Sequence, residues 1–314
     1  MNILYIINYA IFAVFLTLFS LELGIALSML SGRYEKYADR FKAYLNPIWQ
    51  INGTFAVFYL VNFEATYPKL LGILASAYLV PLMLAALFLI LRNAFIAYAE
   101  HSDAVEGKNF YRVYGAATLT SYFLVLSVLC SAASGLGISL SSSSIDLLYV
   151  LFNPFNIILF AASLLLSLFI SFLFFEISEN KLAHYGIAAV SLLALFAGIL
   201  AYLSYSVARL LSHYYLIVAS LVLLLLIVWL KQKENRVARY LSLIWLFSGI
   251  NILGVVLYPY VFGGSASLLD YLTNGETGFW ISVISGFGGA LLAAYMLFFI
   301  YTVYMKKAEG AEGY

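Results

Sequence analysis

Charged residues are scarce in this sequence. Only 10% of its 314 residues are Asp, Glu, Lys or Arg, whereas 64% are hydrophobic. Soluble domains carry about a quarter of their residues as charged side chains, so this composition indicates a polytopic membrane protein. The formal net charge is only +1, which gives no reason to expect nucleic acid as a partner.

Cysteine and histidine are nearly absent as well. The single cysteine, Cys130, cannot form a disulfide within the chain, and we interpret it as a small core residue. The chain has three histidines, His101, His184 and His213, and no Cys/His cluster with the spacing of a zinc site. His184 and His213 are predicted at opposite membrane surfaces, so they cannot share one haem iron. We therefore expect no catalytic, cofactor-binding or metal-binding residues in this chain.

Long apolar runs make up most of the sequence. About 20 apolar residues span a bilayer as a helix, and by this rule the chain has nine spans. They are predicted at residues 4–30, 47–64, 70–94, 113–137, 153–176, 182–206, 213–230, 240–262 and 280–304. The fold class expected is therefore an all-α polytopic membrane protein with nine transmembrane helices. The first span lacks a basic n-region and a cleavage motif, so we interpret it as a retained helix.

The basic residues predict the orientation of the chain. All of the 16 Lys and Arg residues except Lys69 and Arg209 fall on one side of the predicted membrane. Basic loops remain in the cytoplasm, so this asymmetry places the N-terminus outside and the C-terminus inside.

Polar residues inside the first three spans are the most informative ones. Glu22 lies eight residues before the end of the first span, roughly 12 Å into the membrane at 1.5 Å per residue. Trp49, Gln50 and Asn52 begin the second span on the same side, and Arg92 ends the third. Polar groups in hydrocarbon cost free energy unless they find partners, so these residues must face protein or a water-lined path.

Two interpretations of these five residues remain open. The cluster is either a proton or water path that starts at the cytoplasm, or a structural Glu–Arg pair with amide partners. Their spacing alone does not separate the two.

Small residues recur at four-residue intervals in the last span, at Ser282, Gly286 and Ala290. Such spacing lets helices approach closely, so it predicts packing rather than chemistry. The packing partner lies either in this chain or in another.

Four segments carry a resemblance to a known family. They are LELGIALSML at the end of the first span, NPIWQINGTFAVF at the start of the second, FNPFN at 152–156 and LYPYVFGGSASLLDY at 257–271. Their content and order resemble subunit II of the cytochrome bd quinol oxidases. Glu22 occupies an acidic position of the first segment. Pro47, Trp49 and Asn52 match the family's PHWDGNQVW-type segment, and Arg92 also matches.

The resemblance implies both a fold and a function. It implies a four-helix bundle at 1–137, a second at 138–262, and a peripheral ninth helix with its flanks at 263–314. It also implies a quinol oxidase complex that reduces dioxygen to water in the plasma membrane of a prokaryote. The partner expected is subunit I, which holds haem b and haem d, and this chain is expected to stabilise that subunit without being catalytic itself. A structural quinone or lipid in this chain is left open.

One position departs from the family. The aspartate that follows the tryptophan in the family, and is associated there with a cytoplasmic proton pathway, is Gln50 here. Glutamine binds water but does not ionise, so a proton role at this position is in doubt, whereas Glu22 retains an acidic group.

Two other functions are considered. A secondary transporter would have its site near the second span, where Pro81 interrupts the third span. Transporters place such breaks in repeated halves, and the seventh span has no counterpart. An orphan bundle that has lost its oxidase partner is the other alternative. Subunit I itself is disfavoured, because its first span contains a histidine ligand and this chain has no histidine before His101.

Overall fold

We describe the fold from a computed structural model. The structure describes residues 2–101, 104–139, 144–175, 212–233, 237–273 and 275–299, with the single residues Ile177, Gly186, Val190 and Thr302. The rest of the predicted sixth span and His184 lie outside the described residues, as do the side chains of Trp49, Gln50 and His101.

Ten α-helices make up nearly all of the described chain. They are α1 (Ile3–Leu30), α2 (Ala38–Thr66), α3 (Pro68–Ala77), α4 (Leu79–His101), α5 (Ala104–Ser134), α6 (Leu147–Phe152), α7 (Pro154–Phe174), α10 (Tyr214–Gln232), α11 (Val237–Leu257) and α12 (Gly275–Phe299). Three short 3-10 helices accompany them: η1 (Tyr34–Tyr37), η2 (Phe262–Gly264) and η3 (Leu268–Tyr271).

Two small antiparallel strand pairs lie in the connections. Strand β1 (Ile138–Ser139) pairs with β2 (Ser144–Ile145), with Ile138 opposite Ile145. Strand β3 (Tyr260–Val261) pairs with β4 (Ala266–Ser267), with Tyr260 opposite Ser267.

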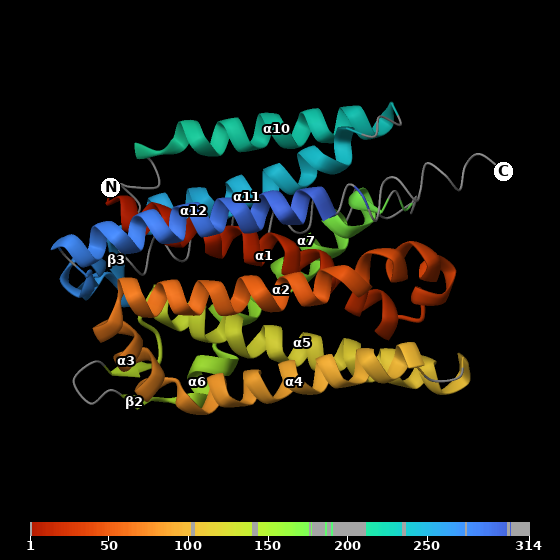
Figure 1. Ribbon diagram of the computed structural model, residues 1–314, viewed down its shortest axis with the longest axis horizontal. Coiled ribbons are helices and arrows are strands. Elements are labelled where there is room, and N and C mark those ends of the chain that lie inside the picture. Colours follow the sequence, from red (N-terminus) through yellow and green to blue (C-terminus); the bar gives the residue numbers. More distant parts are fainter. Residues whose placement is uncertain are drawn as a thin grey trace.

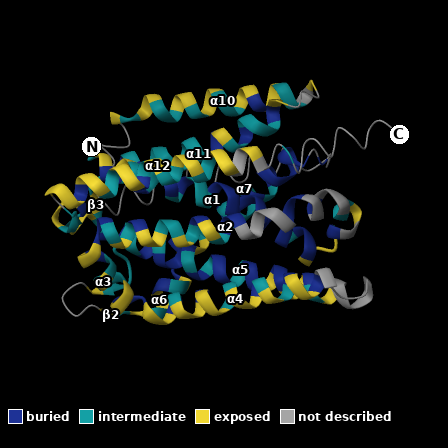
Figure 2. Ribbon diagram, in the orientation of Figure 1, coloured by how far each residue is buried: buried dark blue, intermediate teal, exposed yellow. Residues whose placement is uncertain are grey.

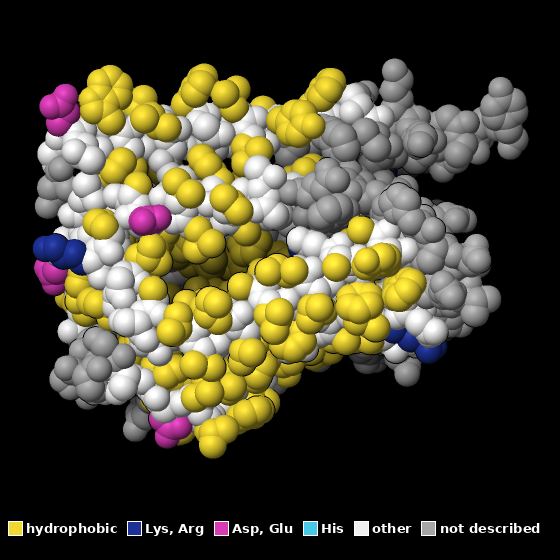
Figure 3. All heavy atoms as spheres, turned by 60° about the horizontal axis from the view of Figure 1, so that its bottom comes forward, with side chains coloured by type: hydrophobic (Ala, Val, Ile, Leu, Met, Phe, Trp, Pro, Cys, Tyr) yellow, Lys and Arg dark blue, Asp and Glu magenta, His cyan; other side chains and the backbone are white. Residues whose placement is uncertain are grey.

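Seven of the described helices are long and apolar enough to cross a membrane, namely α1, α4, α5, α7, α10, α11 and α12. Helix α2 is not among them, in keeping with the polar residues that the sequence places in it. Apolar side chains cover the middle of the face shown in Figure 3, and charged side chains gather towards its ends. The chain is thus a helical membrane protein. A total of nine spans stays a prediction, because the sixth falls mostly outside the described residues.

Helix α1 forms the centre of the molecule (Figure 1). It packs against α2, α5, α7, α11 and α12, while α4 covers α5 and α10 covers α11. The apolar part of α1 is 72% buried, whereas that of α10 is 6% buried, and Figure 2 shows the same gradient from centre to periphery. Because α1 contacts α7 as extensively as α2, the division into two four-helix bundles stays a prediction.

The third predicted span is not one continuous helix. The range 70–94 contains the end of α3 at Ala77 and the start of α4 at Leu79, with Tyr78 between them. Pro81 explains the break, because a proline ring clashes with the carbonyl four residues earlier, which is that of Ala77. Helix α3 is too short to span a membrane, so α4 alone crosses here.

A close crossing of α1 and α7 places the middle of α1 in the core. A Cβ atom on Gly24 would lie only 2.0 Å from Oγ of Ser171, so only glycine permits this approach. The Ser171 hydroxyl donates a hydrogen bond to the carbonyl oxygen of Leu21 across the crossing, at 3.1 Å. Glu22, two residues before the glycine, is therefore held away from both solvent and lipid.

Small residues of α12 pack within this chain in part. A Cβ on Gly286 would lie 3.5 Å from Ile7 of α1, and one on Gly288 would lie 3.3 Å from Phe58 of α2. Ser285 donates a hydrogen bond to Asn62 of α2. Ala290, the last residue of the predicted row, is exposed, so the packing partner of that part of the row stays open.

Candidate functional site

The candidate site is built around Glu22 of α1. Its side chain is 0% exposed, in the most buried part of the most buried helix. An ionised carboxylate in such a position needs both a countercharge and hydrogen-bond donors. The structure supplies them from three other helices.

Helix α4 supplies the countercharge. Nη1 of Arg92 lies 2.7 Å from Oε1 of Glu22, and the arginine side chain is 3% exposed. The contact is ionic rather than an aligned hydrogen bond, because Nη1 makes no hydrogen bond of good geometry among the described residues. Arg92 is held by Asn93, whose Oδ1 accepts from Nε at 3.2 Å, and by Phe19, whose ring centre lies 5.6 Å from Cζ.

Helix α2 supplies an amide. Nδ2 of Asn52 donates to Oε2 of Glu22 at 2.7 Å. The other atom of this amide, Oδ1, is buried and accepts no hydrogen bond from the described residues. A buried acceptor in a polar site is where an ordered water molecule would bind.

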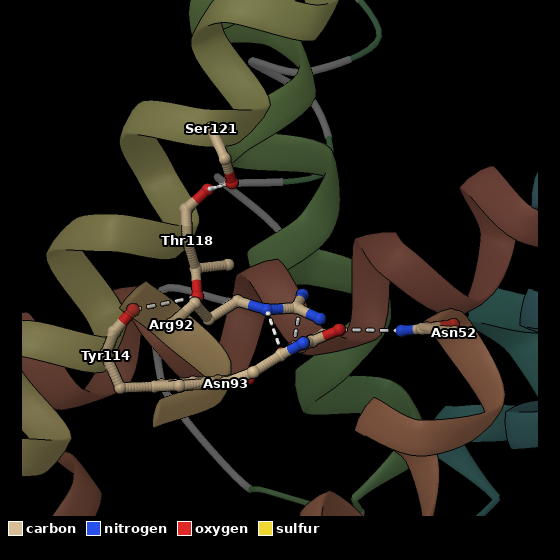
Figure 4. Close-up of polar contacts among 7 residues, drawn as sticks. Asn52, Arg92, Asn93, Tyr114, Thr118 and Ser121 are labelled. Carbon is tan, nitrogen blue, oxygen red and sulfur yellow. Dashed lines mark hydrogen bonds and ion pairs between the residues drawn. The ribbon is translucent and has the colours of Figure 1, made fainter. Parts of the chain in front are cut away.

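Helix α5 supplies a phenol. The hydroxyl of Tyr114 donates to Oε1 of Glu22, and this side chain is 0% exposed. Figure 4 shows Tyr114, Arg92 and Asn52 approaching one another from α5, α4 and α2. The cluster therefore joins four helices through a single carboxylate.

The sequence identified three of the four members of this cluster. The structure brings Glu22, Asn52 and Arg92 into direct contact. The side chains of Trp49 and Gln50 lie outside the described residues, so their part in the site stays a prediction.

The sequence did not single out Tyr114 or the two hydroxyl residues that follow it on the same face of α5. Thr118 donates to the carbonyl of Tyr114 at 2.8 Å, and Ser121 donates to the carbonyl of Thr118 at 2.9 Å. All three are fully buried. Their spacing of four and three residues puts them on one helix face, and that periodicity was the available signal.

A second buried polar cluster lies nearer the other end of α5 and contains no charge. Nδ2 of Asn156 donates to Oγ of Ser127 at 2.7 Å and to the carbonyl of Leu151 at 2.7 Å. Asn153 caps α7 by accepting from the backbone N–H of Asn156 at 2.8 Å, and Pro154 occupies the first turn. This is the NPFN segment of the sequence, and its polar groups terminate and begin helices.

An apolar cavity adjoins the row of hydroxyls. It is small, about 30 Å³ in volume, and partly open to the outside. Its walls come from α1, α4 and α5, at Phe15, Leu16, Phe19, Leu89, Ser121, Tyr122, Val125, Leu126 and Leu129. Phe19 also lies against Arg92, so the cavity ends close to the charged cluster.

Metal ligands are not gathered in the part of the chain that the structure describes. No group of three or more His, Cys, Asp or Glu side chains there is placed to hold an ion. His213, at the start of α10, has Nδ1 3.0 Å from Oγ of Ser212.

Comparisons with known proteins agree with the geometry. The family model described as cytochrome bd terminal oxidase subunit II matches residues 1–303. The fold is similar to that of a chain in the structure of bd oxidase from Geobacillus thermodenitrificans, with a TM-score of 0.77 and 18% sequence identity. That alignment covers 95% of this chain and 97% of the other, and at this identity it shows the fold alone. No curated protein sequence matches the chain.

Proposed function

Because the chain belongs to the family of cytochrome bd terminal oxidase subunit II, we propose that it is the accessory subunit of a bd-type respiratory oxidase. The complex would oxidise quinol and reduce dioxygen to water in the plasma membrane of a prokaryote. The family match over residues 1–303 is the observation that carries this proposal. It favours an oxidase over a transporter, and copurification with a haem-bearing partner distinguishes it from an orphan bundle.

The haems of the complex are assigned to the partner, subunit I. Haem iron needs axial histidine, methionine or cysteine ligands that face a large pocket. His213 is the one histidine whose side chain the structure describes, and it lies beside Ser212 at the start of a peripheral helix. A histidine at that place does not support a haem in this chain, and we propose that the haems lie in subunit I.

The role of this chain in the complex is to stabilise subunit I through apolar helix faces. Helices α4, α10 and α12 are 22%, 6% and 11% buried over their apolar parts, so most of their surface is available to lipid or to a partner. Without water, such faces gain affinity from close packing rather than from the hydrophobic effect. The N-terminus would lie outside and the C-terminus in the cytoplasm.

A second proposed role is to conduct protons from the cytoplasm through the Glu22 cluster. Eight residues separate Glu22 from the end of α1 at Leu30, which is roughly 12 Å along the helix. The carboxylate, the phenol of Tyr114 and the unfilled acceptor of Asn52 are groups that pass or orient protons and water.

A structural role is the competing candidate, and one observation favours it. Glu22 already has a cation and two hydrogen-bond donors, so its negative charge is well stabilised. Such a saturated carboxylate would serve to lock α1, α2, α4 and α5 together.

Substitution of Glu22 by Gln in the purified oxidase separates the two roles. Glutamine keeps the shape of the side chain and one of its two acceptor oxygens, but it cannot ionise. If protons pass here, proton uptake and oxygen consumption per haem should fall about tenfold or more. If the cluster is only structural, haem content and thermal stability should fall while the rate per haem stays normal. Glu64→Gln, at an exposed carboxylate near the other end of α2, is the control and should change neither.

A further inference from the structure

Four residues with hydroxyl groups form a stripe along the predicted cytoplasmic half of α5. They are Tyr111, Tyr114, Thr118 and Ser121, spaced by three, four and three residues. At 3.6 residues per turn these positions fall within about 80° of arc, so they share one face of the helix. Tyr111 is 9% exposed and the other three are 0% exposed, so the stripe begins at the edge of the core and continues inside it.

The outer end of this stripe meets the segment that follows α1. Tyr34, in η1, packs its ring on that of Tyr111, with a centroid distance of 4.9 Å and an angle of 39°. Lys36, two residues later, is exposed, so this segment reaches the surface. Tyr111 is thus the first stripe residue that a proton from this side would meet.

The proton route along the stripe ends at Glu22. Tyr114 donates its hydroxyl hydrogen to Oε1 of the carboxylate. Beyond this point the hydroxyl hydrogens of Thr118 and Ser121 are bonded to backbone carbonyls of α5 itself. The next inward-facing residues include the buried Leu124 and Leu126. The arrangement therefore directs a proton to Glu22 and does not extend it along α5 to the other membrane surface.

From this geometry we infer that protons reach Glu22 through Tyr111 and Tyr114 of α5. This inference rests on the proposed proton-conducting role of the Glu22 cluster. Residues Tyr111 and Tyr114 lie one turn apart, where Cβ atoms are about 5–6 Å from each other. The route requires water between the two hydroxyls to connect them.

The transfer is a proton relay without electron transfer. The O–H bond of Tyr114 breaks as its proton forms a new O–H bond with Oε1 of Glu22. The phenol oxygen takes a replacement proton from the water or hydroxyl on its Tyr111 side, so Tyr114 ends neutral and unchanged. A phenol is suited to this step because it donates and accepts at the same oxygen.

Arg92 and Asn52 hold the receiving carboxylate in place. The guanidinium lies 2.7 Å from Oε1, the oxygen that receives the proton, and it stays charged throughout. The Asn52 amide donates to the second oxygen, Oε2, at 2.7 Å.

The test uses Tyr114→Phe and Tyr111→Phe in the intact purified oxidase, next to Glu22→Gln. Phenylalanine keeps the ring and its packing and removes only the hydroxyl. Proton uptake after an oxygen pulse should slow about tenfold or more in Tyr114→Phe, and several-fold in Tyr111→Phe, because water can replace the outer hydroxyl. The solvent deuterium isotope effect on uptake should rise in both variants. Tyr122→Phe is the matched control, since Tyr122 is a buried tyrosine of the same helix that packs on Phe19, and its uptake rate should not change.

The outcomes distinguish a failure of the tyrosine route from a failure of the proposed proton role of Glu22. Slow uptake in Glu22→Gln with normal uptake in both tyrosine variants overturns the route and leaves the proton role of Glu22 intact. Normal uptake per haem in all three variants overturns both. If Tyr114→Phe does not assemble, Tyr111→Phe decides alone, because Tyr111 lies at the edge of the core. A normal rate and isotope effect in that variant overturn the route.

Discussion

Two buried polar clusters join α5 to its neighbours, and they are built differently. The cluster at Glu22 is ionic, and its contacts bridge 30 and 92 residues of sequence. The cluster at Asn156 is neutral, and most of its contacts lie within the same short segment or cap a helix end. Its one contact with α5, to Ser127, bridges 29 residues.

The two clusters differ in what they contribute to the fold. The neutral cluster satisfies backbone groups that a break between α6 and α7 would otherwise leave unpaired, so it is a consequence of the break. The ionic cluster satisfies no helix end. Buried ion pairs are often no more stabilising than apolar side chains of the same size. Packing alone therefore gives no reason for a charged cluster here, which is why we propose a functional role for it.

The largest expected effect comes from removing the cation alone. Arg92→Met leaves the Glu22 carboxylate buried without a countercharge, which should destabilise the subunit by about 3–5 kcal/mol. The measurement is thermal unfolding of the purified complex, together with its yield. A double variant with Arg92→Met and Glu22→Leu should regain most of the stability. Failure of the double variant to recover would show that the pair is needed for folding and would remove the contrast between the clusters.

A smaller effect is expected from removing the amide of Asn52. Asn52→Leu removes one donor to a charged acceptor, a hydrogen bond worth about 1.5–3 kcal/mol, while Arg92 and Tyr114 remain. Unfolding measurements should therefore place this variant between the wild type and Arg92→Met. A loss as large as that of Arg92→Met would mean that Glu22 depends on Asn52 as much as on its countercharge.

The smallest effect is expected from a change in the neutral cluster. Oγ of Ser127 accepts from Nδ2 of Asn156 at 2.7 Å, and Ser127→Ala removes that bond with the loss of a single oxygen atom. Hydrogen bonds of this kind within membranes contribute about 0.6 kcal/mol. Stability should fall by about that amount, and proton uptake should be unchanged. A change in uptake would show that the two clusters are functionally connected.

The sequence predicted the helices better than it predicted their contacts. Helix α1 was expected at 4–30 and is found at Ile3–Leu30, because a long apolar run has few alternatives in a membrane. The break at Tyr78 was not anticipated, although Pro81 was noted as an interruption of the third span. A proline in a membrane helix can kink it or end it, and the neighbouring chain decides between them.

The site was predicted in part for a related physical reason. Glu22 and Arg92 stand out because a charge in hydrocarbon is costly wherever it lies. Tyr114 does not stand out, because 26 tyrosines are spread through the chain and most are ordinary packing residues. Its role depends on how far α5 is rotated against α1, and that is set by contacts such as the one between Gly115 and Ala26 of α1, where a Cβ would lie 2.9 Å from the carbonyl oxygen. Such contacts are not encoded in any local pattern.

The central position of Glu22 also has a consequence for synthesis of the chain. Seventy residues separate Glu22 from Arg92, and Tyr114 is made later still. At about 5–20 residues per second, the first helix is complete roughly 4–14 s before its countercharge is available. During that interval the acidic helix has only α2 as a neighbour, and the single bond from Asn52 is the one cluster contact that can form. The four-helix arrangement therefore closes in a fixed order, and α1 becomes firmly held only when the ribosome has passed the codon for Tyr114, more than a third of the way along the message.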